Sequence, residues 1–243
     1  MRALGPESPF VQTLQSSFDR LLADDEVVCD LVRKLKDGGY GAVIFGGWAR
    51  DILASEISGT VVAKARDIDF VTSGLNTEEL HALVAEGCRN LFGGLTSKSR
   101  TTALDIWPVQ ETFLIERDGL PPEFDTLPKV ADFNINAVIF KPFPLWREPR
   151  LVDGGCLGAC RARTIGFQYD VIPFPLIQVA RLAIYAAKLG FTFDSDVVGF
   201  IRRFCDTTEA FARVRTGIRD NCPAQTASHA LEILQKVVEL NAF

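Results

Sequence analysis

The sequence predicts an α+β fold in which a mixed β-sheet is flanked by helices and followed by an all-helical region. Over residues 1–155, short apolar segments bounded by turn residues alternate with amphipathic segments of helical period. From Pro175 onward, apolar residues recur only at helical spacing. We therefore expect two domains, residues 1–155 and residues 156–243, with the change in pattern falling between Asp153 and Pro175.

The first part of the chain is expected to form two helices within residues 8–37, because apolar side chains recur there every three or four positions. Gly38-Gly39 ends the second of them. The apolar run Gly41–Phe45 predicts a strand. Trp48–Ser55 then predicts a helix that starts directly after the glycine pair Gly46-Gly47.

Further elements are expected in order along the chain. A helix is predicted over Thr77–Glu86, with Thr77 as its N-cap. Strands are predicted at Arg66–Thr72, Ala103–Val109, Phe133–Phe140 and Leu151–Asp153. Loops are expected at residues 56–65, 116–131 and 142–149, with a turn or short strand at Asn90–Leu95 and a mobile polar segment at Ser97–Thr102.

The C-terminal region reads as helices alone. Apolar residues from Leu176 repeat at helical spacing until Gly190, and Asp194 or Ser195 can cap a second helix. A third amphipathic segment runs from Ser228.

Composition excludes several classes of protein. The 243 residues are 47% hydrophobic and 23% charged, as in a globular protein, and the net charge is −5. That balance argues against a generally basic nucleic-acid-binding surface, although a local basic groove remains compatible with it. The six scattered cysteines predict reduced thiols in a cytoplasmic protein. Prolines and charged residues interrupt the longest apolar stretch, Val171–Phe191, so no membrane span is expected.

Three aspartates are the candidate catalytic residues. In a strand, side chains two positions apart point the same way, so Asp67 and Asp69 project from one face. Two such carboxylates repel unless a cation lies between them, and Mg²⁺ favours carboxylate oxygens together with substrate phosphates. Asp105, which alternates with apolar residues in another strand, is a third candidate. Three carboxylates on adjacent strands would suit a two-metal phosphoryl or nucleotidyl transfer.

The glycine pair changes how the aspartates are interpreted. A bare Asp-x-Asp is more often part of a solvated sheet face. Gly46-Gly47, however, lies between a strand and a helix, where glycine lets the backbone approach a phosphate and the helix N-terminus adds aligned N–H groups. A strand, a glycine pair, a helix and an Asp-x-Asp in the next strand together favour a nucleotide site.

Four ordered segments carry a resemblance to a known family. They are FGGWARDIL with ARDIDF (residues 45–70), DFNINAVIF (Asp132–Phe140) and RLAIYAAKLGFTFD (Arg181–Asp194). These segments resemble the head and neck of class II tRNA nucleotidyltransferases and bacterial poly(A) polymerases, in the polymerase-β-like nucleotidyltransferase superfamily. The resemblance implies a catalytic head with a mixed sheet, a helical neck and a two-metal Mg²⁺ site.

The resemblance also implies roles for individual residues. The metal ligands and catalytic residues would be Asp67, Asp69 and Asp105. Gly46 and Gly47 would hold the triphosphate, and Arg50 and Asp51 would brace the turn and the phosphates. The remaining nucleotide-binding positions would be Asp132 and Asn136, for ribose or phosphate, and the neck arginine Arg181. Arg66, next to Asp67, could steer a triphosphate or lie in a solvated loop.

The chain departs from the family where substrates are chosen. Val130 and Ala131 stand where the family usually has two arginines. The neck motif that reads ATP and CTP, Glu-Asp-x-x-Arg, corresponds here to Phe174, Pro175 and Gln178. Ordinary CCA addition is therefore doubtful, although the catalytic head is complete.

These observations predict a metal-dependent nucleotidyltransferase that moves a nucleoside monophosphate from an NTP to an acceptor hydroxyl. The preferred acceptor is an RNA 3′ end resembling that of tRNA. One alternative keeps the chemistry and takes a small molecule or a protein side chain as acceptor. Another is a non-catalytic nucleotide- or RNA-binding module. The neck arginines could form an RNA surface or simply the polar face of packed helices: Arg161, Arg163, Arg202, Arg203, Arg213, Arg215 and Arg219.

Overall fold

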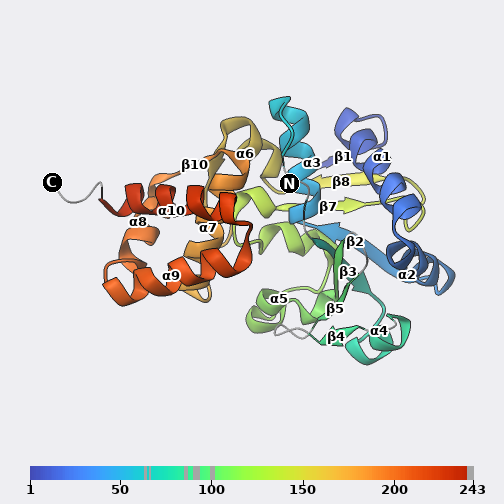
Figure 1. Cartoon of the computed structure of the whole chain (residues 1–243). Coiled ribbons are helices and arrows are strands. Elements are labelled where there is room, and N and C mark those ends of the chain that lie inside the picture. The colour runs from blue at the N-terminus through green and yellow to red at the C-terminus, as the bar shows by residue number, and fades with distance from the viewer. Residues whose placement is uncertain (63–64, 66, 85–86, 90–93, 99–101, 240–243) are drawn as a thin grey trace.

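The computed structural model describes residues 1–62, 65, 67–84, 87–89, 94–98 and 102–239. Within these residues, an eight-stranded mixed sheet with flanking helices precedes a group of helices at the C-terminal end (Figure 1). The predicted α+β class is confirmed.

The sheet has the order β1-β8-β7-β2-β3-β6-β5-β4. Strands β3 and β6 pair in parallel, and the other neighbouring strands of this sheet pair antiparallel. The predicted strands near residues 41, 67, 103 and 151 are all present. The strands are β1 (Arg2–Leu4), β2 (Gly41–Phe45), β3 (Asp67–Ser73), β4 (Cys88–Arg89), β5 (Leu95–Lys98), β6 (Ala103–Pro108), β7 (Val138–Lys141) and β8 (Arg150–Asp153).

One face of the sheet packs on helices. Alternate residues of β3, such as the fully buried Ile68 and Phe70, join a large apolar core with residues of the flanking helices. The helices that contribute are α1 (Pro9–Asp24), α2 (Glu26–Asp37), α3 (Gly47–Ser58), α4 (Thr77–Leu83) and α6 (Cys156–Ala162). The two predicted N-terminal helices are therefore confirmed, with Asp25 capping α2 through backbone N–H groups of its first turn.

The opposite face carries a smaller apolar core at one end. Val43, Val71 and Ile139 pack there with residues of α5 (Phe113–Asp118) and of two 3₁₀ turns, Val109–Glu111 and Phe124–Lys129. Asp67, Asp69 and Asp105 alternate with core residues on β3 and β6, so they project from this face. Strand β2 ends beside the start of β3 and leads into α3, so the carboxylates lie at the end of the sheet where α3 begins.

The C-terminal region consists of α7 (Pro175–Leu189), α8 (Ser195–Phe204), α9 (Thr208–Asn221) and α10 (Ala224–Glu239). Asp194 caps α8 by accepting a hydrogen bond from the Val197 N–H, as predicted. A short parallel pair, β9 (Thr164–Ile165) with β10 (Thr192–Phe193), interrupts the helical pattern. Helix α7 lies at the boundary between the sheet and the other C-terminal helices (Figure 1).

The predicted strand Phe133–Phe140 is wrong in its first half. Residues Asn134–Asn136 form a 3₁₀ turn, and only Val138–Lys141 pairs in the sheet. The side chains explain the difference: Asn134 accepts a hydrogen bond from the N–H of Gly166, 32 residues away in sequence, and Asn136 donates one to Asp132. Hydrogen bonds made by such short polar side chains compete with the pairing of a regular strand.

Several other expectations need correction. The N-cap of α4 is Asn76, in a capping box with Glu79, and Thr77 instead hydrogen-bonds to Glu111. The predicted loop 116–131 contains the end of α5 and a 3₁₀ turn. Residues 97–98 of the predicted mobile segment belong to β5, whereas residues 99–101 lie outside the described residues. Strand β1 and helix α9 had no counterpart in the sequence-based prediction, and α10 begins before Ser228.

Candidate active site

The three candidate carboxylates lie on neighbouring parallel strands. In the pairing of β3 with β6, Asp69 stands directly opposite Asp105, and Asp67 is two residues before Asp69. Their apolar neighbours Ile68 and Phe70 are fully buried on the other face. The alternation of side chains therefore brings all three carboxylates to the same side of the sheet.

Electrostatics show that the carboxylates act on one another. Burial, followed by the charges of Asp67 and Asp105, raises the pKa of Asp69 to about 8. Two guanidinium groups, those of Arg181 and Arg50, act in the opposite direction. The site thus combines a concentration of negative charge with arginines close enough to oppose it.

The carboxylates fit a divalent cation by donor type and charge. Mg²⁺ binds carboxylate oxygens together with substrate phosphates, and a cation between the strands would remove the repulsion that raises the pKa of Asp69. As they stand, no group of three or more His, Cys, Asp or Glu side chains in the described residues is placed so that it could hold a metal ion. Asp105 accepts a hydrogen bond from the Thr96 hydroxyl on the neighbouring strand β5.

The glycine turn lies between β2 and α3. Gly46 has φ 65° and ψ −111°, a conformation that only glycine adopts without strain, and its N–H donates to the Val138 carbonyl. No side chain caps the first turn of α3. The turn therefore offers backbone N–H groups at a helix N-terminus, the arrangement that binds anions in many proteins.

Arg50 and Asp51 lie beneath this turn. Both are only 3% exposed. Arg50 donates from Nε to Asp51 Oδ1 at 2.9 Å and from Nη1 to Asn136 Oδ1 at 2.6 Å. Burial by itself would lower the pKa of Arg50, but the adjacent Asp51 carboxylate raises it overall, so the guanidinium stays charged. Their contacts brace the turn from below, and neither side chain is open to solvent.

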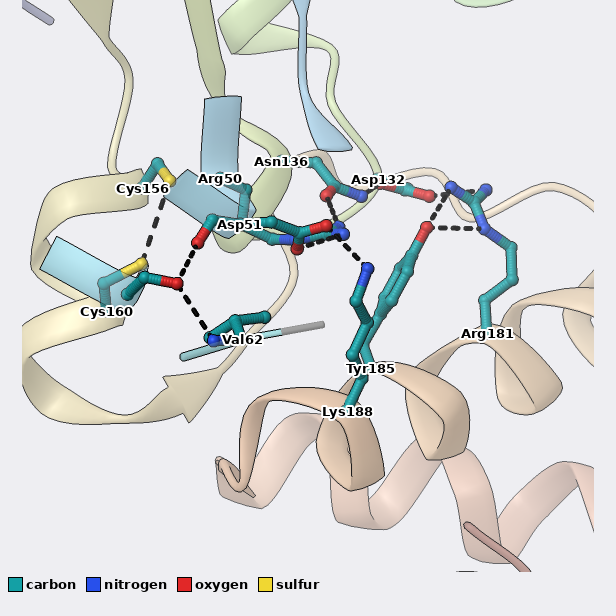
Figure 2. Close-up of polar contacts among 11 residues, drawn as sticks. Arg50, Asp51, Val62, Asp132, Asn136, Cys156, Cys160, Arg181, Tyr185 and Lys188 are labelled. Atoms are coloured by element: carbon teal, nitrogen blue, oxygen red, sulfur yellow. Dashed lines mark hydrogen bonds and ion pairs between the residues drawn. The ribbon is translucent and has the colours of Figure 1, made fainter. Parts of the chain in front are cut away.

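Asp132 and Asn136 extend the same network toward α7. Asn136 donates from Nδ2 to Asp132 Oδ1 at 2.8 Å. The other oxygen of Asp132, Oδ2, lies 2.7 Å from Nη1 of Arg181. Figure 2 shows the resulting row of side chains, from Arg50 through Asn136 and Asp132 to Arg181. Four of the predicted site residues, from three separate segments, are therefore in one hydrogen-bonded chain.

Two residues of α7 that the sequence had not singled out complete the network. Tyr185 accepts hydrogen bonds from Nε and Nη2 of Arg181 at 3.3 and 3.0 Å, and the Arg50 guanidinium lies 4.5 Å from the centre of its ring. Lys188 places Nζ 2.6 Å from Asp51 Oδ2 (Figure 2). The available signal was their spacing from Arg181, because residues four and seven positions along a helix share its face.

Among the described residues, the neck arginines that the sequence suggested add no further contact to this network. Arg66 lies outside the described residues. Along the sequence, the exposed neck arginines are interspersed with exposed acidic residues such as Asp206, Glu209 and Asp220. Arg202 is partly buried and donates to the Val237 carbonyl.

Comparison with known proteins gives a match in structure but not in sequence. No family model and no curated protein matches the chain. A solved structure described as a CCA-adding enzyme in complex with ATP matches with a TM-score of 0.64 and 15% identity, over 98% of this chain and 55% of that one. A tRNA nucleotidyltransferase with a primer tRNA and an incoming ATP analogue matches with a TM-score of 0.59 and 20% identity, over 86% and 61% of the two chains. The fold is that of tRNA nucleotidyltransferases.

A structure described as a tRNA-processing enzyme in its apo form adds a third match, with a TM-score of 0.58 and 19% identity. The chain covers between 55% and 61% of the length of these three neighbours. The resemblance read from the four sequence segments is therefore confirmed at the level of fold. Among the described helices, none has both the length and the apolar character that crossing a membrane requires.

Proposed function

We propose that this chain is a divalent-metal-dependent nucleotidyltransferase that transfers a nucleoside monophosphate from an NTP to an acceptor hydroxyl and releases pyrophosphate. The observation that carries the proposal is the placement of Asp67 and Asp69 on β3 alongside Asp105 on β6. The uncapped N-terminus of α3, at Gly46-Gly47, follows the strand next to β3 and supplies the phosphate-binding element.

Mg²⁺ is the proposed cofactor, bound by Asp67, Asp69 and Asp105 as a two-metal site. When bound, the ions would lower the pKa of the attacking hydroxyl and neutralise charge on the leaving pyrophosphate. The chain itself positions the other groups. The glycine turn would bind phosphate oxygens through backbone N–H groups, and Arg181, whose side chain is 39% exposed, would contact the nucleotide on the side of α7.

Asp132 and Asn136 are proposed to position rather than to react. Each spends at least one side-chain bond on an arginine, Asp132 on Arg181 and Asn136 on Arg50. Asn136 is buried, with its amide bonded to both Arg50 and Asp132, so it would act on a ribose or phosphate group indirectly, through the orientation of Asp132 and Arg181. Because Arg50 is buried, its proposed role is to hold the glycine turn and Asn136 in a fixed position relative to each other.

The proposed acceptor is an RNA 3′ end resembling that of tRNA. Structural neighbours that are tRNA nucleotidyltransferases, one of them with a primer tRNA, support this choice. The replacement of the family's base-reading residues by Phe174, Pro175 and Gln178 argues against ordinary CCA addition. A small-molecule or protein acceptor is the second candidate, favoured by the net charge of −5.

Incubation with Mg²⁺, each labelled NTP and total RNA tests the proposal, with pyrophosphate release followed in parallel. Label in RNA supports the RNA acceptor. Pyrophosphate that depends on an added small molecule or protein, without label in RNA, supports the second candidate. NTP binding without pyrophosphate release from any acceptor would instead indicate a non-catalytic nucleotide-binding module.

Matched variants separate catalysis from folding. Asp67→Asn with Asp69→Asn keeps the size of both side chains but removes two ligand charges, and should lower the rate at least about a hundredfold. Asp220→Asn, at an exposed position on α9, should leave the rate unchanged. Full activity in the double variant would reject the metal assignment.

A further inference from the structure

The side of α7 that faces the sheet carries a continuous row of side chains. From its C-terminal end, Lys188, Tyr185 and Arg181 contact Asp51, Arg50 and Asp132. Gln178 is one turn further and accepts a hydrogen bond from Arg181. One more turn brings the row to Phe174, immediately before the helix. Steps of three and four residues keep the four positions within the helix on the same face, and Phe174, the N-cap residue, lies at the end of this row.

At this end of the row the surface is apolar. Phe174 is 48% exposed, Ile177 54% and Phe113, on α5, 41%. The rings of Phe113 and Phe174 have centroids 5.7 Å apart and an interplanar angle of 43°. We call the two phenylalanines, together with the adjacent Ile177, the aromatic patch. Most large apolar side chains of the chain are in its two cores, so an exposed pair of phenylalanines next to the site calls for a ligand with apolar faces.

The fold holds both rings of the patch in place. Phe174 has φ 55°, a left-handed conformation that is costly for a residue with a bulky side chain, and its carbonyl accepts from the N–H groups of Ile177 and Gln178. On the α5 side, Arg117 is paired with Asp118. Asp118 in turn accepts a hydrogen bond of 2.7 Å from Tyr169, which ties α5 to the segment that leads into α7.

We propose that the aromatic patch stacks the base of the bound NTP and that this chain accepts all four bases with similar affinity. The inference rests on the proposed function and adds the mode of base recognition. Phe174 precedes Arg181 by seven residues, which is about 10 Å along a helix and close to two full turns. The patch is therefore separated from the guanidinium beside Asp69 by a distance that the sugar and α-phosphate of a nucleotide can span.

The chemistry of the row explains the absence of base preference. Phe174 and Pro175 have no side-chain hydrogen-bonding groups, and Gln178 is 6% exposed with Oε1 engaged by Arg181. Aromatic stacking, in contrast, is available to every base because every base has a π-face. We expect ATP, GTP, CTP and UTP to bind within about threefold of one another, with the larger purines slightly tighter.

Calorimetric titration of the full chain in Mg²⁺ tests the patch, with the four NTPs and tripolyphosphate as separate ligands. Phe174→Ala should weaken all four NTPs about tenfold and leave tripolyphosphate unchanged. Phe174→Trp keeps an aromatic ring and should retain affinity. Phe113→Ala provides an independent variant of the same patch, and Phe143→Ala, an exposed phenylalanine in another loop, serves as the matched control.

The outcomes distinguish the patch from the proposed function. If tripolyphosphate binds and the Phe174 and Phe113 variants bind NTPs as the parent does, the patch is rejected and the nucleotidyltransferase proposal stands. A preference of more than tenfold for one base also rejects it. An effect of Phe174→Ala on the KM of an RNA acceptor alone would assign the patch to the acceptor and overturn the inference. Failure of the parent to bind either tripolyphosphate or NTPs would reject the proposed function itself.

Discussion

Lys188 on α7 and Asp51 on α3 are 137 residues apart in sequence and are joined by an ion pair of 2.6 Å. Asp51 is 3% exposed and also holds Arg50 beneath the glycine turn. The ion pair therefore connects the C-terminal helices to the element that we propose binds the triphosphate. A shift of α7 relative to the sheet would therefore move Asp51, and with it the first turn of α3 next to Gly46-Gly47.

Replacement of Lys188 by Met should destabilise the protein by about 3 kcal/mol, because it leaves a buried carboxylate with one cation fewer. In a protein of this size each kcal/mol corresponds to about 2–4 °C in Tm. Urea unfolding measures the free energy directly. Lys236→Met, at an exposed position on α10, is the control and should change it by less than about 0.5 kcal/mol. Equal effects of the two substitutions would show that the ion pair contributes nothing specific.

Replacement of Arg50 by Lys should lower both stability and activity although the charge is retained. Lysine cannot donate to Asp51 and Asn136 at once in the planar geometry of a guanidinium. We expect a loss of about 2–3 kcal/mol, from buried polar groups left without a partner, together with a fall in kcat/KM. Asn136→Ala removes one of the same hydrogen bonds, so the two effects should be less than additive. Strict additivity in a double-mutant cycle would argue against a shared network.

The sequence was most informative where chemistry depends on local periodicity. The common side of Asp67 and Asp69 follows from the two-residue repeat of a strand, and the uncapped turn follows from Gly46-Gly47 before a helix. Asp105 lies next to Asp69 because β3 pairs with β6, and these two strands are not consecutive in the sequence. The resemblance to a known family supplied that step, because periodicity does not specify which strands pair.

Long-range contacts explain what could not be predicted. The hydrogen bond between Arg50 and Asn136 spans 86 residues, and Asn136 lies in a 3₁₀ turn where a strand had been expected. Tyr185 and Lys188 looked like ordinary positions of an amphipathic helix. Their spacing from Arg181 puts them on one face of α7, but their partners depend on the side on which α7 meets α3. Tertiary packing, rather than any local preference, gives these residues their partners.

Replacement of Tyr185 by Phe should separate positioning from stability. The hydroxyl accepts two hydrogen bonds from Arg181, whose side chain is 39% exposed and can bond to water instead. We therefore expect less than about 1 kcal/mol of destabilisation. Arg181 would then be held only through Nη1, by Asp132 and Gln178, with Nε and Nη2 free to rotate away. The KM for NTP should therefore rise several-fold, while the ring of Phe still packs against Arg50. Tyr40→Phe is the matched control. An unchanged KM would mean that Tyr185 is only a packing residue.

Binding of Mg²⁺ should stabilise the protein more at pH 8 than at pH 5. The pKa of Asp69 is raised from 3.8 to about 8, so in the metal-free protein the folded state keeps a proton that the unfolded state has lost across this range. Stability of the metal-free protein should consequently fall as the pH rises from about 4 to about 8. At pH 8 a cation relieves the repulsion among ionised carboxylates, whereas at pH 5 it must first displace the proton on Asp69.

Thermal unfolding at both pH values, with EDTA or with Mg²⁺, measures this effect. Asp69→Asn removes the titrating group, so the variant should lose most of the pH-dependent fall in Tm and most of the stabilisation by Mg²⁺. Asp220→Asn should behave like the parent, because its carboxylate is exposed on α9. An increase in Tm with Mg²⁺ that is the same at pH 5 and pH 8, or that persists in Asp69→Asn, would place the cation elsewhere on the protein.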